Sequence, residues 1–207
     1  MVMVEDLLVE GPDRGRTLVL AHGAGAPMDS PFMRHMAEGL ASEGLRTVRF
    51  EFPYMQERRR TGRRRPPDSG ESLSCAWREV VERLGGGEQM VIGGKSLGGR
   101  IASMIADDIG ARGLVCLGYP FHPSGKPDVL RVAHLRELRT PTLIVQGTRD
   151  ALGRRDEVEG YDLSPNLRLI WLEDGDHSFK PRVRSGRTER QNMDQAIEAV
   201  AGFVKGR

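Results

Sequence analysis

Short apolar runs that are typical of buried strands alternate with helix-like segments along nearly the whole chain. Six runs are predicted as strands because consecutive apolar or β-branched residues are closed by glycine, proline or polar residues. Strands that alternate with helices of about 10 to 15 residues favour a mostly parallel sheet with helices on both faces, which is the α/β fold class. The predicted strands are Thr17–His22, Arg46–Phe52, Gln89–Ile92, Leu114–Leu117, Thr142–Gln146 and Leu167–Leu172.

Apolar residues three and four positions apart predict helices between these runs. Two capping boxes are predicted, Asp68 with Glu71 and Thr188 with Gln191. Residues 53–69 interrupt the alternation with prolines, glycines and six arginines, and we expect an irregular surface segment there. The predicted buried stripes are Met33, Met36, Ala37 and Leu40; Leu73, Trp77, Val80, Val81 and Leu84; Ile101, Met104, Ile105 and Ile109; and Met193, Ile197, Val200, Ala201 and Val204.

The composition bounds the class of protein. The 207 residues are enough for one domain and short for two, so residues 1–207 are expected to form a single domain. The net charge of +2 does not indicate a nucleic-acid-binding protein. No apolar stretch approaches the roughly 20 residues that span a bilayer, and residues 1–10 lack the pattern of a signal peptide. Two cysteines, Cys75 and Cys116, exclude a disulfide framework and are expected to be half-buried thiols of a cytoplasmic protein.

The candidate catalytic residues lie at the ends of the predicted strands. In a parallel sheet these ends lie on one edge, where functional groups collect. Residues 22–25 read HGAG, 94–98 read GKSLG, 146–150 read QGTRD and 175–177 read GDH. The second stretch matches G-x-S-x-G, in which small neighbours allow a serine to occupy a tight strand-to-helix turn. In a chain with 26 glycines the motif alone is weak evidence for a catalytic serine. Its position between a predicted strand and a predicted helix strengthens this evidence.

The stretches LVLAHGAGAPM, RFEFPYM, GGKSLGGR, VQGTRD and GDHSF resemble the alpha/beta-hydrolase superfamily. The resemblance covers nearly the whole chain and is strongest to the small, cap-poor, dienelactone-hydrolase-like branch, particularly its testis-expressed and histone-acetyltransferase-complex relatives. It implies the alpha/beta-hydrolase fold, and the gaps between the predicted elements leave no room for an inserted cap domain. The order of serine, acid and histidine in that family is met by Ser96, Asp150 and His177, each after a predicted strand.

The resemblance implies a role for each of these residues. Ser96 would be the nucleophile, His177 the base that takes its proton, and Asp150 the group that fixes the tautomer of the imidazole. Asp176 is the competing acid, but a residue next to the histidine in the chain rarely reaches the ring of its neighbour. The backbone N–H of Leu97 at a helix start and that of Ala24 would form the oxyanion hole, with Gly25 as a substitute for Ala24.

Other residues compete for these roles. His35 and His134 are expected on the surface, and His22 is expected to hold the following glycine-rich loop by a structural hydrogen bond. His122 is a candidate for lining the pocket. Lys95 adjoins the nucleophile but is expected to point elsewhere. Cys116 lies in a predicted buried strand and lacks the exposure that a nucleophilic thiol needs.

Metal and cofactor sites find no support in the sequence. No histidine, cysteine or carboxylate cluster has the spacing of metal ligands, so neither a metal nor a cofactor is expected. Residues 93–96 read GGKS, like the end of a phosphate-binding P-loop. That motif needs glycine six residues before the lysine, and Gln89 occupies this position.

Six arginines fall within residues 58–65. A solvated surface segment is the simplest interpretation. Because the segment follows a strand that ends on the active-site edge, Tyr54, Arg63 and Arg64 are also candidates for substrate binding, where they would favour an anionic acyl group. Tyr54 is the only aromatic ring close to the arginines, which argues against a site for single-stranded nucleic acid.

Two classes of function remain open from the sequence. The first is a serine hydrolase that cleaves a carboxylic ester, a thioester or an amide of a small-molecule acyl substrate through an acyl-enzyme. The second is a non-catalytic binding or scaffold protein on the same fold, since fold alone does not fix function. The sequence predicts neither the physiological substrate nor the oligomeric state.

Overall fold

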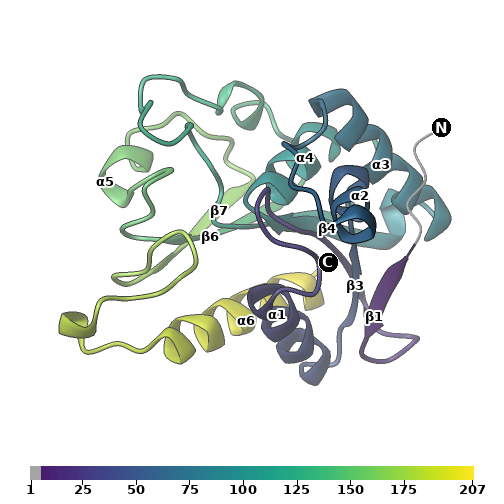
Figure 1. Cartoon of the computed structure of the whole chain (residues 1–207). Coiled ribbons are helices and arrows are strands. Elements are labelled where there is room, and N and C mark those ends of the chain that lie inside the picture. The colour runs from purple at the N-terminus through teal and green to yellow at the C-terminus, as the bar shows by residue number, and fades with distance from the viewer. Residues whose placement is uncertain (1–5) are drawn as a thin grey trace.

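The computed structural model describes residues 6–207, and its centre is a sheet with the strand order β1-β3-β2-β4-β5-β6-β7 (Figure 1). All neighbouring strands from β3 to β7 in this order pair in parallel. The six predicted strands are confirmed, with shifts of up to three residues at their ends. They are β2 Thr17–Ala21, β3 Arg46–Phe50, β4 Met90–Lys95, β5 Gly113–Leu117, β6 Thr142–Gly147 and β7 Leu167–Leu172.

A seventh described strand, β1 Leu7–Glu10, pairs antiparallel with β3 at the edge of the sheet. The sequence did not predict it because four residues with partial burial give no clear periodicity. The expectation about the N-terminal ten residues falls partly on residues 1–5, which lie outside the described residues. Within the described part of the chain, no helix combines the length and the apolar character that crossing a membrane requires.

Helices cover both faces of the sheet, as predicted (Figure 1). On one face lie α1 Pro31–Ser42 and α6 Glu189–Lys205, and on the other lie α3 Gly70–Arg83 and α4 Leu97–Ile105. Each face has its own apolar core, one around Trp77 and one around the methionines of α1. The α/β class is confirmed, and no separate cap interrupts the elements of residues 6–207.

Most predicted helix stripes are buried, but the details of the helix ends differ. The capping box of Thr188 and Gln191 is confirmed at the start of α6. At α3 the cap is Ser69, whose hydroxyl accepts a hydrogen bond from Ser72 N at 3.2 Å, so the predicted box of Asp68 and Glu71 is wrong. Met104 was expected in a buried stripe and is 44% exposed, because it lies on the outer face of α4.

The segment 53–69 is partly helical, which corrects the expectation of an irregular segment. Helix α2, Pro53–Thr61, begins with proline at a position where its missing N–H has no partner to lose. Arginines in its last turn suit the negative end of the helix dipole. A further short helix, α5 Arg155–Val158, follows β6. Of the thiols, Cys116 is buried and Cys75 is exposed, so neither is half-buried as expected.

Candidate active site

Ser96 occupies a strained turn between β4 and α4. Its backbone has φ 50° and ψ −110°, one of few positive φ values among the described residues other than glycine. A side chain on Gly98 would meet Ala21 O at 2.4 Å, and one on Gly94 would meet the same oxygen at 2.2 Å. Glycine is therefore required by close approach of the backbone, as the motif predicted. Strain of this kind concentrates at functional sites.

The ends of three strands bring Ser96, His177 and Asp150 together. His177 Nε2 lies 3.0 Å from Ser96 Oγ, and His177 Nδ1 lies 2.7 Å from Asp150 Oδ2. Asp150 is fully buried and accepts hydrogen bonds from Gln146 Nε2 at 3.0 Å and from Leu152 N at 2.9 Å. These donors satisfy the hydrogen-bonding capacity of the buried carboxyl oxygens and fix their position. The geometry is that of a hydroxyl, a base and a group that orients the base.

Asp176, the competing acid, makes different contacts. Its Oδ1 accepts hydrogen bonds from Ser178 N at 2.8 Å and Lys180 N at 3.0 Å. Asp176 therefore closes the turn that carries His177, while Asp150 contacts the ring itself. The roles assigned to the two aspartates remain a prediction that these distances support.

The candidate oxyanion donors lie at the ends of β4 and β2. Leu97 is the first residue of α4, where a backbone N–H has no partner within the helix. Ala24 and Gly25 are exposed in the turn after β2. The carbonyl oxygens of this turn are held by Tyr54 Oη, 3.2 Å from Ala24 O, and by Arg58, which donates to Gly25 O at 3.2 Å. A contact with substrate at these N–H groups remains a prediction.

His22 holds the base of the same turn, in keeping with the structural role expected for it. Its Nδ1 lies 2.7 Å from Gly23 O, and its Nε2 accepts a hydrogen bond from Phe52 N at 3.1 Å. Burial lowers the pKa of His22, so the ring is neutral at neutral pH, as an acceptor from a backbone N–H must be.

Two candidate substrate-binding residues are buried by other contacts. Tyr54 is 1% exposed and lies under the turn after β2, where burial raises the pKa of its hydroxyl. His122 is 3% exposed, with Nδ1 2.9 Å from Pro123 O and Nε2 3.4 Å from Glu157. Both side chains contact loop backbone, and their contribution to substrate binding remains a prediction.

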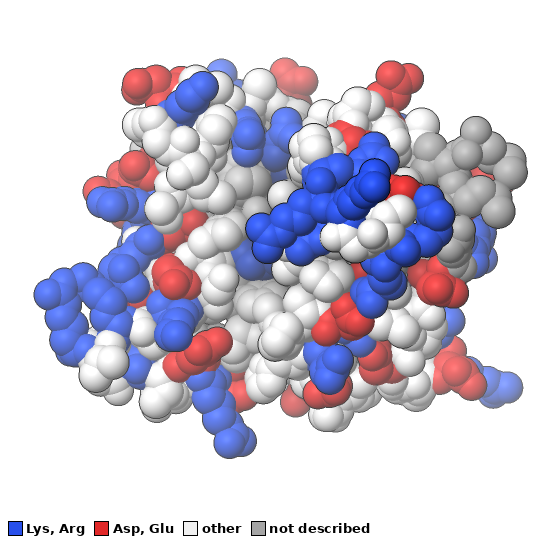
Figure 2. All heavy atoms as spheres, viewed as in Figure 1, with Lys and Arg blue, Asp and Glu red and all other residues white. Residues whose placement is uncertain are grey.

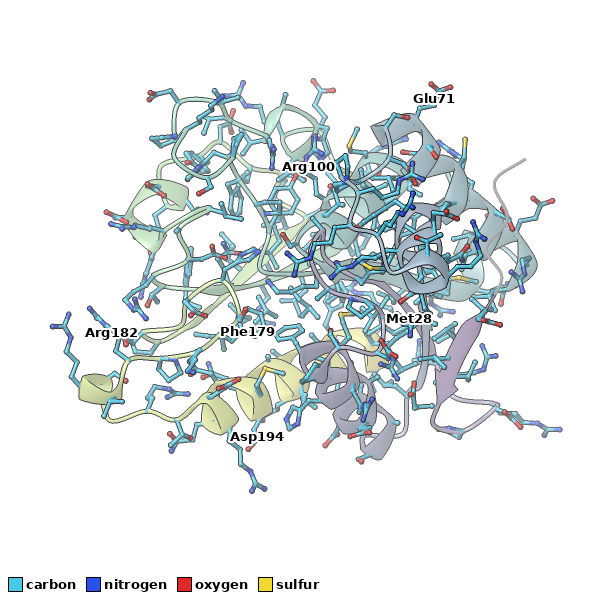
Figure 3. All side chains as sticks on the ribbon, viewed as in Figure 1. Met28, Glu71, Arg100, Phe179, Arg182 and Asp194 are labelled. Carbon is cyan, nitrogen blue, oxygen red and sulfur yellow. The ribbon has the colours of Figure 1, made fainter. Side chains whose placement is uncertain are left out.

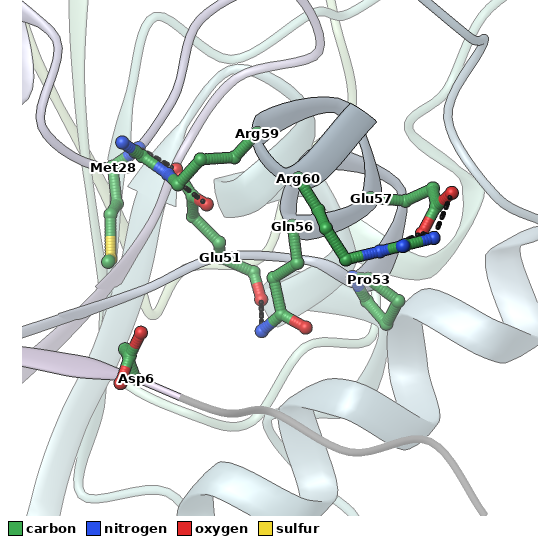
Figure 4. Close-up of a pocket in the computed structure, with 8 residues that line it drawn as sticks. All are labelled: Asp6, Met28, Glu51, Pro53, Gln56, Glu57, Arg59 and Arg60. Atoms are coloured by element: carbon green, nitrogen blue, oxygen red, sulfur yellow. Dashed lines mark hydrogen bonds and ion pairs between the residues drawn. The ribbon is translucent and has the colours of Figure 1, made fainter. Parts of the chain in front are cut away.

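Most arginines of residues 58–65 have partners within the protein. Arg59 contacts both Asp29 and the buried Glu51, Arg60 pairs with Glu57, and Arg65 pairs with Asp68. Figure 4 shows Arg59 turned toward Glu51 at the edge of a pocket. Figure 2 shows the basic side chains gathered over α2 and the segment that follows it, beside a hollow.

Two arginines of this segment differ from the others. Arg63 and Arg64 are exposed, and within residues 6–207 neither is paired with a carboxylate. Arg58 also lacks a carboxylate partner in this part of the chain, but its guanidinium group donates to Gly25 O, whereas the side chains of Arg63 and Arg64 make no such contact with the described residues. A contribution of Arg63 and Arg64 to substrate binding remains a prediction.

Two further residues lie in places that the sequence did not predict. Lys95 was expected to point away from the site, but its ammonium group donates a hydrogen bond to the backbone oxygen of His177. His134 was expected at the surface and is half-buried, with Nε2 2.9 Å from Ser103 Oγ. His35 is exposed, as expected. Lys95 ends β4 and His177 follows β7, so the two residues are far apart in the sequence and only the fold brings them together.

An open groove begins next to His177, between the starts of α1 and α6. Its volume is about 700 Å³, and Ser178, directly after His177, forms part of its wall. Figure 3 labels Phe179 and Asp194 near these helices. The groove was not predicted from the sequence because its lining comes from segments far apart in the chain. The lining residues are Pro31, Phe32, His35, Ser178, Glu189, Arg190, Met193 and Asp194.

A family model described as an alpha/beta hydrolase domain matches residues 14–205, and the chain therefore belongs to the alpha/beta hydrolase family. Among solved structures, the chain is similar to an alpha-beta serine hydrolase homologue from Coxiella burnetii, with 19% identity, a TM-score of 0.68, and coverage of 95% of this chain and 90% of that one.

Two further solved structures share the fold. A serine hydrolase without lid from Xanthomonas campestris is 18% identical, with a TM-score of 0.67 and coverage of 94% and 86%. The protein Est1E from Butyrivibrio proteoclasticus, solved with ferulic acid bound, is 16% identical, with a TM-score of 0.65 and coverage of 95% of both chains. The fold class predicted from the sequence, with its minimal cap, agrees with these likenesses.

Proposed function

We propose that this protein is a serine hydrolase that cleaves a carboxylic ester of a small acyl substrate through an acyl-enzyme. The observation that carries the proposal is the continuous chain of hydrogen bonds from Ser96 Oγ through the His177 ring to buried Asp150. The strained backbone of Ser96 supports it, because that turn presents the hydroxyl at the edge of the sheet.

The acylation step follows from these positions. The Ser96 Oγ–H proton moves to His177 Nε2 as Oγ forms a bond to the substrate carbonyl carbon. The negative oxygen that results faces the N–H groups of Leu97 and Ala24. The proton on Nε2 then moves to the leaving alcohol oxygen as its bond to carbon breaks, which leaves the acyl group on Ser96.

Deacylation repeats the same transfers with water. His177 Nε2 takes a proton from the attacking water as the water oxygen forms a bond to the acyl carbon. The proton on Nε2 then moves to Ser96 Oγ as the bond from Oγ to the acyl carbon breaks, which releases the acid and restores the hydroxyl. Asp150 keeps Nδ1 protonated throughout and stabilises the imidazolium that forms twice per cycle. Thioesters and amides would pass through the same steps. The ester is the class that we propose, and it is therefore tested first.

The finer expectations from the sequence are part of this proposal. Similarity of the motifs supports placement in the dienelactone-hydrolase-like branch, and the continuity of the sheet supports a single domain across residues 1–207. Two free thiols are compatible with the reducing cytoplasm. Unpaired Arg63 and Arg64 support a preference for acyl groups that carry a negative charge.

Turnover of short-chain nitrophenyl esters tests the proposal. The wild-type protein should hydrolyse at least one ester, and Ser96→Ala should reduce kcat by about 10³-fold or more. Ser42→Ala is the matched control, because Ser42 is exposed at the end of α1 and its hydroxyl donates a hydrogen bond to Glu38 O in the same helix. Folded protein that hydrolyses no ester, thioester or amide would instead favour the binding or scaffold role.

A further inference from the structure

Lys95 is a buried cation directly before the candidate nucleophile. It is the last residue of β4 and is 9% exposed, which is rare for lysine. Burial lowers the pKa of its ammonium group to about 8, while the charges of Asp150 and Asp176 oppose this shift. A buried lysine is costly unless its charge is compensated, so its contacts indicate what it does.

Lys95 contacts the segment that carries His177 and the start of α1. Its Nζ donates a hydrogen bond to the backbone oxygen of His177 and lies 5.4 Å from the ring centre of Phe32 and 5.8 Å from that of Phe179. The two ring contacts lie within the range of cation–π interactions. A side chain on Gly118 would approach Nζ to 2.7 Å, so glycine at the end of β5 leaves the space that the ammonium group fills.

The segment around His177 is anchored at its ends by other residues. Arg149 N donates to Gly175 O at 2.9 Å before His177, and Asn192 Nδ2 donates to Phe179 O at 2.8 Å after it. Between these anchors, the backbone oxygen of His177 itself is bound by Lys95. The strand that presents Ser96 therefore also contacts the peptide group from which the His177 ring extends.

We propose that Lys95 is a positioning residue for His177, fixing the distance between the base and the hydroxyl of Ser96. The inference rests on the proposed hydrolase function. The physical reason is that the ring reaches Ser96 Oγ at 3.0 Å only while the His177 backbone stays in place. A displacement of about 1 Å in a reacting group costs up to about 100-fold in rate.

The test compares Lys95→Met with Lys180→Met in the full chain on a neutral nitrophenyl ester. Lys180 lies in the same segment with an exposed side chain, so it controls for loss of a positive charge near the site. Lys95→Met should lower kcat about 10- to 100-fold with KM changed less than about threefold, because positioning acts on the chemical step. Lys180→Met should change both constants less than about twofold.

A double variant separates positioning from general damage to the structure. In a His177→Gln background, where the base is absent, adding Lys95→Met should lower the residual rate less than about twofold. An equal loss in both backgrounds would overturn the proposal, as would a kcat of Lys95→Met within about twofold of wild type. Lys95→Gln, which is neutral and too short to reach the same oxygen, should show the same loss and serves if the methionine variant does not fold.

The hydrolase proposal fails separately from this one. If Ser96→Ala retained the ester activity of the wild type, the proposed function would be wrong and the activity would not come from this site. If Ser96→Ala were inactive while Lys95→Met kept its kcat, only the positioning role would be wrong.

Discussion

Two charged regions lie at the same edge of the sheet and are held in opposite ways. Asp150 is fully buried and accepts three hydrogen bonds, from Gln146, Leu152 and His177. The arginines of residues 58–65 lie mostly in solvent, and those with partners form ion pairs of α2 and its neighbours. Surface pairs of this kind contribute little to stability, whereas a buried, hydrogen-bonded carboxylate has a fixed position.

The difference teaches that density of charge in a sequence does not mark a site. The sequence has six arginines in this segment, yet three of them, Arg59, Arg60 and Arg65, pair with nearby carboxylates. Asp150 is a single residue after the end of β6, and hydrogen bonds from Gln146 and Leu152 hold its carboxyl group against the His177 ring. Substitutions should therefore have large effects on activity in the first region and small effects in the second.

The largest effect is expected at Asp150. Asp150→Asn should lower kcat by about 10³- to 10⁴-fold, because the amide no longer holds the productive tautomer of His177. Asp176→Asn should stay within about fivefold of wild type, because its carbonyl oxygen still accepts the two backbone hydrogen bonds. Steady-state kinetics on one neutral ester measures both variants. A crippled Asp176→Asn with a mild Asp150→Asn would reverse the assignment of the acid.

A smaller effect concerns the stability of the first region with pH. The folded protein loses the Lys95 proton near a pKa of about 8, whereas lysine in the unfolded chain keeps it to 10.5. Between these values the unfolded state binds more protons, so the free energy of unfolding should rise with pH relative to that of Lys95→Met. The relative gain should be about 1–2 kcal/mol from pH 7 to pH 9.5. Urea unfolding of both proteins at the two pH values measures this gain. An equal change in the free energy of unfolding for wild type and Lys95→Met would contradict the prediction.

Within the arginine region, the ion pair of Arg59 and Glu51 is expected to have a larger effect on stability than the other arginines. Glu51 is 2% exposed and loses a charged partner in Arg59→Gln, while it keeps the hydrogen bond from Met28 N. We expect a loss of about 1 kcal/mol in the free energy of unfolding, less than for a fully buried pair because Arg59 is half exposed. Chemical denaturation of the variant tests this expectation, and an unchanged midpoint would show that solvent already screens the pair.

The smallest effect is expected for Arg63 and Arg64. Changing both to Gln should alter the free energy of unfolding by less than about 0.5 kcal/mol, because their side chains are exposed. If they bind substrate, kcat/KM should fall for a carboxylate-bearing ester and stay unchanged for a matched neutral ester. Assays of both esters at two salt concentrations decide the matter. Equal losses on the two esters, or none, would remove the proposed selectivity for anions.

The sequence predicts what depends on local pattern. Apolar runs such as Leu167–Leu172 and the cap at Thr188 are confirmed because burial and capping are read from neighbouring residues. The order of Ser96, Asp150 and His177 along strand ends predicted a set of residues that the structure brings within hydrogen-bonding distance. Their chemical roles remain proposals.

What the sequence did not predict depends on contacts between distant segments. Tyr54 was expected at the pocket, and only the fold shows that α2 carries it beneath the turn after β2. Lys95 was dismissed because neighbours on a turn usually diverge, but the space at Gly118 lets its long side chain reach the His177 backbone. Proline in residues 53–69 was interpreted as a helix breaker, although Pro53 begins a helix.

The most direct test of the account is covalent labelling with a fluorophosphonate probe, followed by mass mapping of the modified peptide. An activated serine reacts with such a probe, whereas an ordinary surface serine does not. We expect modification of the folded protein at Ser96, strongly slowed labelling in His177→Gln, and none in Ser96→Ala. Modification at another serine, or none in folded protein, would contradict the central claim that Ser96 is an activated nucleophile.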